Sequence, residues 1–360
     1  MTHRERQLTA IAHVEPDRIP VDAIHIENVP EIAAHLGIAA DAVLERLGLD
    51  GRAVGVGYLG ALPPPQDGEP LSEWGTPAQH DYGTGHWYPL ADAATSADLA
   101  RHAWPDPARY DYAGAAAAAA ALHAAYAVRG PYWVPLFCRV CSLAGMEATL
   151  VSLATDPAAF EALLDAVFAR VAEICRRFVH ACGDSLDILC LGDDFATQRG
   201  MLFEPALWRR YLKPRLAELF ALGKRAGKPV WFHSCGDITA ILPDLIDIGM
   251  DVWETVQLHT LPLSPAVLKR EYGRHLAFFG AVNTQRLPFA TPAEVAAEVA
   301  ACCRTLGRGG GYICGPDHHV KPDVPPANVV ALFAAATGFR PAPAATPRTT
   351  KPKRRLPTCN

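Results

Sequence analysis

A histidine and a cysteine two positions apart are the residues of this chain whose types and spacing best suit chemistry. They occur in the stretch Val230-Trp231-Phe232-His233-Ser234-Cys235-Gly236-Asp237, where an apolar run turns polar. Alternate side chains of a strand point to the same face, so His233 and Cys235 can contact one ion. Imidazole nitrogen and thiolate sulfur are ligands that zinc takes. The pair predicts a metal site, although both residue types also pack well in protein cores.

Two further polar clusters follow apolar runs elsewhere in the chain. They are Gly192-Asp193-Asp194 and Cys314-Gly315-Pro316-Asp317-His318-His319. In a parallel barrel the carboxyl ends of all strands face one rim, and active sites are built there. Adjacent carboxylates at a strand end are often only loop caps. Three polar clusters on one rim nevertheless favour an active site there.

The elements that must position these residues can be predicted from the alternation of short β-branched or aromatic runs with helical stretches. This alternation is typical of a parallel sheet with crossover helices. Thr291-Pro292-Ala293-Glu294 is a capping box that predicts a helix ending at Gly307, Ser264-Pro265 begins another, and Glu204-Pro205 begins a longer one ending near Gly227. The predicted strands are Ile19–Ala23, Gly51–Val56, Tyr132–Phe137, Asp187–Gly192, Val230–Cys235, Asp251–Val256, Leu276–Val282 and Gly311–Gly315.

Eight strands with intervening helices predict an α/β fold, a (β/α)8 TIM barrel over residues 1–340 with an insertion of about residues 59–107 after the second strand. An open doubly wound sheet is the alternative. Gly55-Val56-Gly57-Tyr58-Leu59-Gly60 has the letters of a dinucleotide fingerprint, but the prolines that follow cannot open the helix that such a motif needs. The barrel is therefore favoured.

Composition and charge narrow the class of protein. The chain has 360 residues, 33 basic and 38 acidic, and a formal charge of −5. Its 10 cysteines fall at irregular spacings, which is typical of reduced thiols in a cytoplasm rather than of a disulfide framework. No signal peptide and no membrane span are expected, because no apolar run has the required length and composition.

The last residues differ from the rest. Residues 341–360 are rich in Pro, Thr and Ala and in basic side chains, with no acidic residue. Such a segment cannot bury enough apolar surface to order itself, so a disordered basic tail is predicted. A solvated tail is favoured over a nucleic-acid contact.

Several motifs together resemble the uroporphyrinogen decarboxylase superfamily, from Arg4 to about Gly338. The resemblance implies the (β/α)8 barrel. It is carried by Pro16-Asp17-Arg18-Ile19-Pro20, Trp104-Pro105-Asp106-Pro107, Gly192-Asp193-Asp194 followed by Thr197-Gln198-Arg199-Gly200, His233-Ser234-Cys235-Gly236-Asp237, and Gly311-Tyr312-Ile313 leading through His318 to Asp323-Val324-Pro325-Pro326.

Within the superfamily, the chain is most similar to the zinc-dependent, corrinoid-linked methyltransferases. The decarboxylases carry an arginine-rich sequence at the first strand, whereas this chain has Ile19-Pro20-Val21-Asp22-Ala23-Ile24-His25. The methyltransferase branch holds zinc with a His-x-Cys pair and a third ligand after the last strand. The resemblance therefore implies that His233, Cys235 and His318 bind Zn²⁺, with His318 where the branch usually has cysteine.

The leading hypothesis is an enzyme, a zinc-dependent methyltransferase that moves a methyl group between a corrinoid protein and a thiol or similar small-molecule acceptor. Asp194 would be a fourth ligand or a proton acceptor, and His318 would act in catalysis as well as in metal binding. Arg199, Asn283 and Asp193 are the predicted substrate-binding residues. One alternative is a decarboxylase of a porphyrinogen or a smaller carboxylated substrate, and another is a noncatalytic protein that senses metal or corrinoid.

Overall fold

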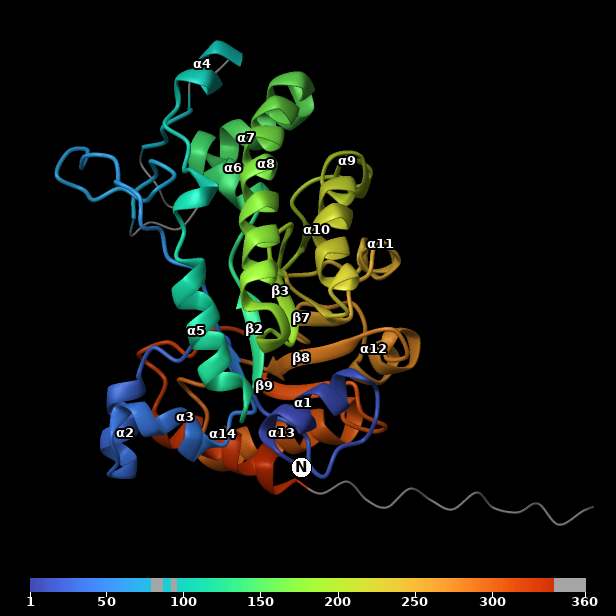
Figure 1. Ribbon diagram of the computed structural model, residues 1–360. Helices are drawn as coiled ribbons and strands as arrows, with labels where there is room; N and C mark the ends of the chain where they lie inside the picture. The colour runs from blue at the N-terminus through green and yellow to red at the C-terminus, as the bar shows by residue number, and fades with distance from the viewer. Residues whose placement is uncertain (79–86, 92–95, 340–360) are drawn as a thin grey trace, which may run out of the picture.

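The parallel sheet that organises this protein follows from buried, β-branched and aromatic runs that recur along the chain. A computed structural model describes residues 1–78, 87–91 and 96–339 (Figure 1). The main sheet has seven parallel strands in the order β1-β2-β3-β6-β7-β8-β9. They are β1 (Gly51–Ala53), β2 (Ala127–Pro131), β3 (Ile188–Gly192), β6 (Val230–His233), β7 (Val252–Val256), β8 (Ala277–Val282) and β9 (Tyr312–Pro316).

The eighth position of the barrel is held by a single bridge. Val21 pairs with Cys314 of β9 in parallel, and its carbonyl accepts the Asp50 amide at 2.8 Å, just before β1. The sheet therefore curls round until β9 and β1 are joined through residues 20–22. The predicted strand Ile19–Ala23 thus lies in the predicted place but forms only an isolated bridge, because Pro20 has no amide hydrogen to donate to a ladder.

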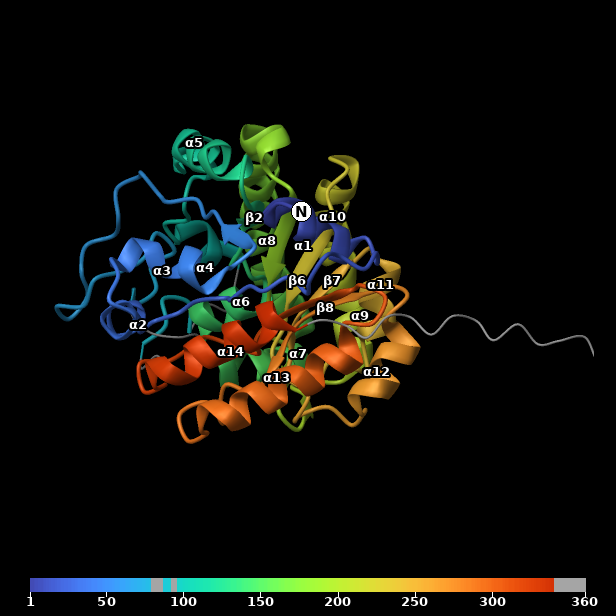
Figure 2. The same ribbon diagram turned by 90° about the horizontal axis from the view of Figure 1, so that it is seen from below.

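Helices cover the outside of the sheet, as the crossover pattern predicts. Figure 2 shows α13 and α14 side by side, and α1 lies against the starts of β2 and β9. The helices are α1 (His3–Ile11), α2 (Val29–Leu36), η1 (Ala40–Ala42), α3 (Val43–Leu47), α4 (Ser96–Arg101), η2 (Pro107–Arg109), α5 (Tyr112–His123), α6 (Phe137–Ala144), α7 (Met146–Thr155), α8 (Pro157–Cys182), η3 (Gly183–Ser185), α9 (Pro205–Tyr211), α10 (Lys213–Arg225), α11 (Leu242–Asp247), α12 (Pro265–Tyr272), α13 (Pro292–Leu306) and α14 (Pro326–Gly338).

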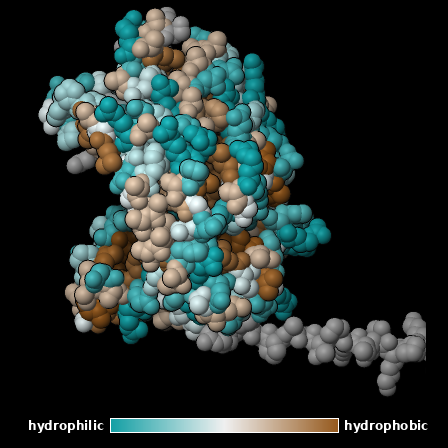
Figure 3. Space-filling view, viewed as in Figure 1, coloured by the Kyte–Doolittle hydropathy of each residue, from teal (hydrophilic) through white to brown (hydrophobic). Residues whose placement is uncertain are grey.

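Two apolar layers result from this arrangement. The larger one lies between the sheet and its helices, whereas the smaller one fills the barrel with side chains from alternate strand positions, such as Ile188 and Cys190 of β3 and Ala277 and Phe279 of β8. Trp231 belongs to the inner layer, so His233, two positions on, also points inward at the carboxyl end of β6. On the outside, hydrophilic residues are interspersed with small apolar patches (Figure 3).

The helix signals in the sequence are confirmed with one exception. Thr291 forms the predicted capping box of α13, which is followed by Gly307, and Ser264 caps α12. The long helix expected from Glu204 to near Gly227 is wrong, because it is two helices, α9 and α10, that meet at Leu212. Pro214 is the reason, since it lacks the amide hydrogen that a continuous helix would need there.

The predicted strand Tyr132–Phe137 is also wrong. The strand in this region is β2, which ends at Pro131, and Phe137 already begins α6. The carboxylate of Asp193 accepts the backbone amides of Leu136, Phe137 and Cys138 at 3.0, 2.6 and 2.8 Å. This cap starts a helix where the aromatic and β-branched letters alone favoured a strand.

The regions expected to lie outside the barrel are described only in part. Between β1 and α5 the described residues form turns, isolated bridges and the short helices α4 and η2, and Figure 1 shows this segment extending away from the sheet. Residues 79–86 and 92–95 of the predicted insertion, and the predicted tail 341–360, lie outside the described residues. Residues 54–60 form no helix, as the prolines after Gly60 predicted.

A membrane crossing requires a long apolar helix. In the part of the chain that the structure describes, no single helix is both long and apolar enough for one. Helices α6 and α7 reach the length only as a pair, and that pair is bent by 108°.

Candidate metal centre

Three side chains that are distant in sequence converge at the carboxyl-end rim of the barrel. His233 ends β6, Cys235 lies two residues beyond it, and His318 follows β9. One ligand atom from each lies within 4.8 Å of the other two, and Cys235 Sγ is 3.4 Å from His233 Nε2. Zinc–nitrogen and zinc–sulfur bonds of about 2.0 and 2.3 Å place tetrahedral ligand atoms roughly 3.5 Å apart. The donor set therefore fits one zinc ion with small side-chain adjustments.

A buried glutamate on the neighbouring strand holds His233 from behind. Glu254 of β7 is fully buried, and its carboxylate accepts a hydrogen bond from His233 Nδ1 at 2.7 Å. The same carboxylate accepts the Tyr132 hydroxyl at 3.2 Å and the Trp231 indole N–H. Because Nδ1 carries the donated hydrogen, Nε2 is the nitrogen that is free to face Cys235 and a metal.

The electrostatic environment suits this arrangement. Burial raises the pKa of Glu254, but the hydrogen bond from His233 and the nearby Arg129 guanidinium hold it below its ordinary value overall. Glu254 is therefore a carboxylate that can accept from His233. Burial, together with the neighbouring His233, lowers the pKa of His318 to about 4. The imidazole of His318 is therefore neutral near pH 7 and has a lone pair for a metal.

The Glu254 carboxylate leads to a testable prediction. Changing Glu254→Gln keeps the shape but removes the charge that orients His233, and we expect zinc affinity to fall about 10- to 100-fold. Competition with a chromophoric chelator measures this. Glu271→Gln, on the exposed part of α12, is the matched control and should leave the affinity unchanged. Equal affinities for the two variants would show that Glu254 does not support the ligand.

The two aspartates after β3 have different surroundings. Asp194 Oδ1 accepts the backbone amide of Cys235 at 2.8 Å and lies 3.7 Å from His233 Nε2. Asp194 is thus beside the donors, where a fourth ligand or a proton acceptor was predicted. Asp193 points to the other side and caps α6, and burial raises its pKa to about 6 in spite of the three amides it accepts. Its predicted role in substrate binding stays a prediction.

A cavity of about 450 Å³ lies next to the candidate metal centre. Cys235 and His318 are part of its wall, as is Gln257, whose Oε1 accepts the Gly236 amide at 2.8 Å. Gly236 has φ +79°, and a Cβ at this position would lie 2.4 Å from the Thr197 carbonyl oxygen. Thr197 belongs to the hairpin of β4 (Ala196–Thr197) and β5 (Gly200–Met201). Only glycine therefore lets the loop after β6 pass this close to the hairpin. The rest of the wall comes from Ala196, Thr197, Gln198, Thr284, Gln285, Pro288, Phe289, His319, Lys321 and Asp323.

Comparison with known proteins places the chain in a family. A sequence profile described as Uroporphyrinogen decarboxylase (URO-D) matches residues 128–339, which carry β2 to α14 and all three donors. The chain belongs to the uroporphyrinogen decarboxylase family. Among solved structures, a methyltransferase from Methanosarcina mazei is similar with a TM-score of 0.62 at 20% identity, over 93% of this chain and 98% of that one. At 20% sequence identity, the similarity to this structure shows the fold alone. A comparison with curated proteins finds no significant match.

Two other residues predicted to bind substrate lie at the edge of this family member's cavity. Arg199 is exposed in the turn of the β4–β5 hairpin, and its neighbour Gln198 lines the cavity. The Asn283 side chain accepts the Gln285 amide at 2.9 Å and shapes the turn that carries Thr284 and Gln285 into the wall. Neither side chain is brought to the three donors. Both roles stay predictions, and Glu254 and Gln257 are the neighbours that sequence reasoning missed.

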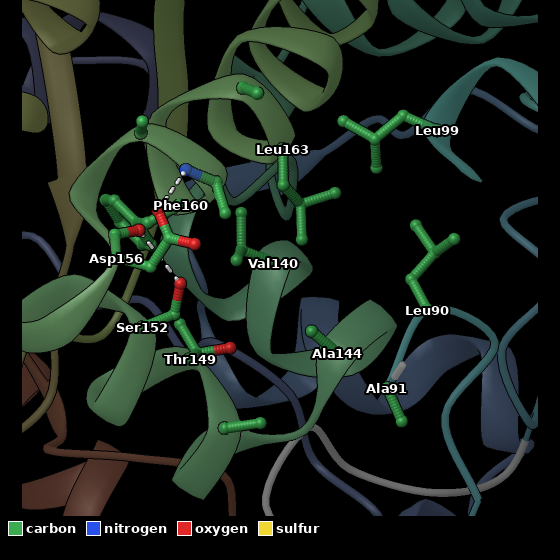
Figure 4. A pocket seen from close by; sticks show the side chains of 14 residues that line it. Leu90, Ala91, Leu99, Val140, Ala144, Thr149, Ser152, Asp156, Phe160 and Leu163 are labelled. Carbon is green, nitrogen blue, oxygen red and sulfur yellow. Dashed lines mark hydrogen bonds between the residues drawn. The ribbon is translucent and has the colours of Figure 1, made fainter. Parts of the chain in front are cut away.

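A separate cavity of about 310 Å³ in this uroporphyrinogen decarboxylase family protein lies among α6, α7, α8 and the residues Leu90, Ala91 and Leu99 (Figure 4). Most of the residues that line it are apolar, among them Val140, Phe160 and Leu163. Its polar members serve the helices, since Asp156 accepts the Ala159 amide at the start of α8. None of the three metal donors lines it, so it has no evident part in the chemistry.

Proposed function

We propose that this protein is a zinc-dependent methyltransferase that moves a methyl group from a corrinoid protein to the sulfur of a small thiol. One observation carries the proposal, namely the convergence of His233, Cys235 and His318 on one point beside an open cavity that Cys235 and His318 line. The family supports it through the barrel, and the similar structure from Methanosarcina mazei is itself described as a methyltransferase.

The chain's own residues would contribute position and charge. His233 and Cys235 would hold zinc from β6 and His318 from the loop after β9, with Glu254 fixing the ring of His233. A zinc ion held there favours the thiolate form of an acceptor thiol, which is the nucleophilic form. Asp194 lies close enough to take up the thiol proton or to direct it to solvent.

The cavity wall suits a small polar acceptor. The amide side chains of Gln198, Gln257 and Gln285 can hydrogen-bond to such an acceptor, and Lys321, which pairs with Glu27, and Asp323 place one charge of each sign at the wall. Phe289, 86% exposed, lies at the same cavity. An exposed aromatic side chain at the mouth suits a partner protein that presents a methyl group there.

Metal content is the direct test of the proposal. We expect the purified protein to contain close to one zinc per chain by plasma emission spectrometry. Removal of the metal by a chelator should abolish transfer of methyl groups from methylcobalamin to thiols, and zinc should restore it. Protein that is active without metal, or that releases carbon dioxide from a carboxylated substrate instead, would overturn the proposal and favour decarboxylation.

A further inference from the structure

A second cavity, of about 80 Å³, lies next to the metal centre. Trp133 connects the two places, because its ring contacts that of His233 with centroids 5.4 Å apart and also lines this cavity. The polar members of the wall are Glu73, Tyr110 and Arg139, and Trp74 is a further aromatic member. We refer to this space as the Arg139 cavity.

Arg139, on α6, is unusual among the charged residues inside the described part of the chain. Within that part its guanidinium makes no hydrogen bond and no ion pair, and its Nε is buried without a partner. Its contact is with the face of Trp74, at 4.8 Å from the ring centroid. Arg139 as a whole is half-buried, and among its five N–H donors it is the one on Nε that is buried and unpaired, which is costly. The side chain is therefore prepared for an acceptor that the protein does not supply.

The nearest carboxylate does not fill this need. Glu73 lines the same cavity and accepts the Tyr110 hydroxyl at 3.2 Å, yet it forms no ion pair with Arg139 among the described residues. Glu73 still raises the pKa of Arg139, against the larger lowering by burial, so the two charges do influence each other. A second negative charge on a ligand would be repelled by Glu73. The cavity therefore suits a monoanion better than a dianion such as phosphate.

The shape of the guanidinium narrows the ligand further. One face of Arg139 is covered by the Trp74 indole, so its edge is what remains for hydrogen bonding. A planar, bidentate carboxylate matches that edge. We propose that the Arg139 cavity binds the carboxylate of a small monocarboxylate beside Trp133, the residue that also contacts His233. Carboxylate binding at this cavity does not depend on the proposed function. The further step, that the carboxylate belongs to the acceptor thiol, rests on the proposed function.

Propionate is the simplest probe of the cavity. Saturation-transfer NMR on the full chain should show saturable propionate binding for the natural protein and at least a tenfold weaker affinity for Arg139→Gln. Arg139→Lys keeps the charge but not the planar edge, so its propionate affinity should lie between those of the natural protein and Arg139→Gln. Arg270→Gln, in an exposed ion pair on α12, is the matched control and should bind as the natural protein does.

The outcomes separate this proposal from the function proposed above. Loss of propionate binding in Arg139→Gln with zinc content unchanged supports the cavity, and so does propionate binding in a protein that holds no zinc. Natural protein without saturable binding overturns the proposal, as does Arg139→Gln with unchanged affinity. Circular dichroism melting identifies a variant that fails to fold. If Arg139→Gln does not fold, the propionate affinity of Arg139→Lys decides between these outcomes. With cobalt in the metal site, 3-mercaptopropionate should bind at least tenfold more tightly than 2-mercaptoethanol, and Arg139→Gln should remove that preference.

Discussion

Replacing Cys235 with alanine is expected to lower zinc affinity about a thousandfold and to reduce thiol methylation to background. Zinc binding to a protein site has a free energy of about 12 kcal/mol. If three donors share it equally, loss of one donor removes roughly 4 kcal/mol, which is about three decades of affinity. Cys235 is also the one thiolate of the set, so the remaining histidines would form a harder site. Chelator competition and methyl transfer from methylcobalamin measure the two effects.

Cys182→Ala is the control for this experiment. Cys182 is buried at the end of α8 and is not among the converging donors, so its loss should leave metal content and transfer unchanged. Cobalt substitution adds an independent signal, since the sulfur-to-cobalt charge-transfer band should vanish in Cys235→Ala and persist in Cys182→Ala. A band that survives without Cys235 would mean that another sulfur binds the metal.

Replacing Asp50 with alanine is expected to lower the free energy of unfolding by about 3 to 5 kcal/mol. The fully buried carboxylate accepts hydrogen bonds from His3 at 2.8 Å, Arg6 at 2.7 Å and Arg18 at 2.8 and 3.0 Å. It also accepts the Val21 amide at 2.8 Å, at the bridge that joins β9 to β1. Alanine would leave two guanidinium groups with fewer acceptors and weaken the seam of the barrel. Urea denaturation monitored by tryptophan fluorescence measures the change.

Asp41→Ala provides the matched comparison for Asp50. Asp41 is exposed in η1 and should change the free energy of unfolding by less than about 0.5 kcal/mol. If Asp50→Ala also stayed within 1 kcal/mol of the natural protein, the carboxylate could not be the centre of the seam as described here. In that case the bridge at Val21 would depend on its backbone pairs alone.

The barrel could be predicted from the sequence because its strands are short buried runs bounded by turn residues. β3, β6, β7, β8 and β9 all lie within a residue or two of their predicted ranges. The prediction failed where a tertiary contact outweighed local preference. Nothing in Tyr132–Phe137 itself reveals that Asp193, distant in sequence, accepts the amides of Leu136, Phe137 and the following Cys138 and so begins a helix.

Part of the candidate site could also be predicted from local sequence pattern. His233 and Cys235 stand out because a two-residue spacing at a strand end has a fixed geometric meaning. Glu254 carried a signal that was not used, because an acid inside the otherwise apolar run of β7 must find a partner when buried. Arg139 gave no such signal. Its lack of acceptors depends on how Trp74 and Glu73, far away in the chain, are placed around it.

The single bridge between Val21 and Cys314 has a consequence for biosynthesis. The two residues that close the ring are far apart in the sequence. Val21 can pair with Asp50 early in synthesis, but its partner on the other side, Cys314, is absent until β9 has been made. Until then the backbone of residues 20–22 and the end of α1 lack the partners that β9 and the residue before it provide. Late closure through such distant contacts is slow and vulnerable to aggregation. Assistance from a chaperone would matter most in this interval, before release of the completed chain.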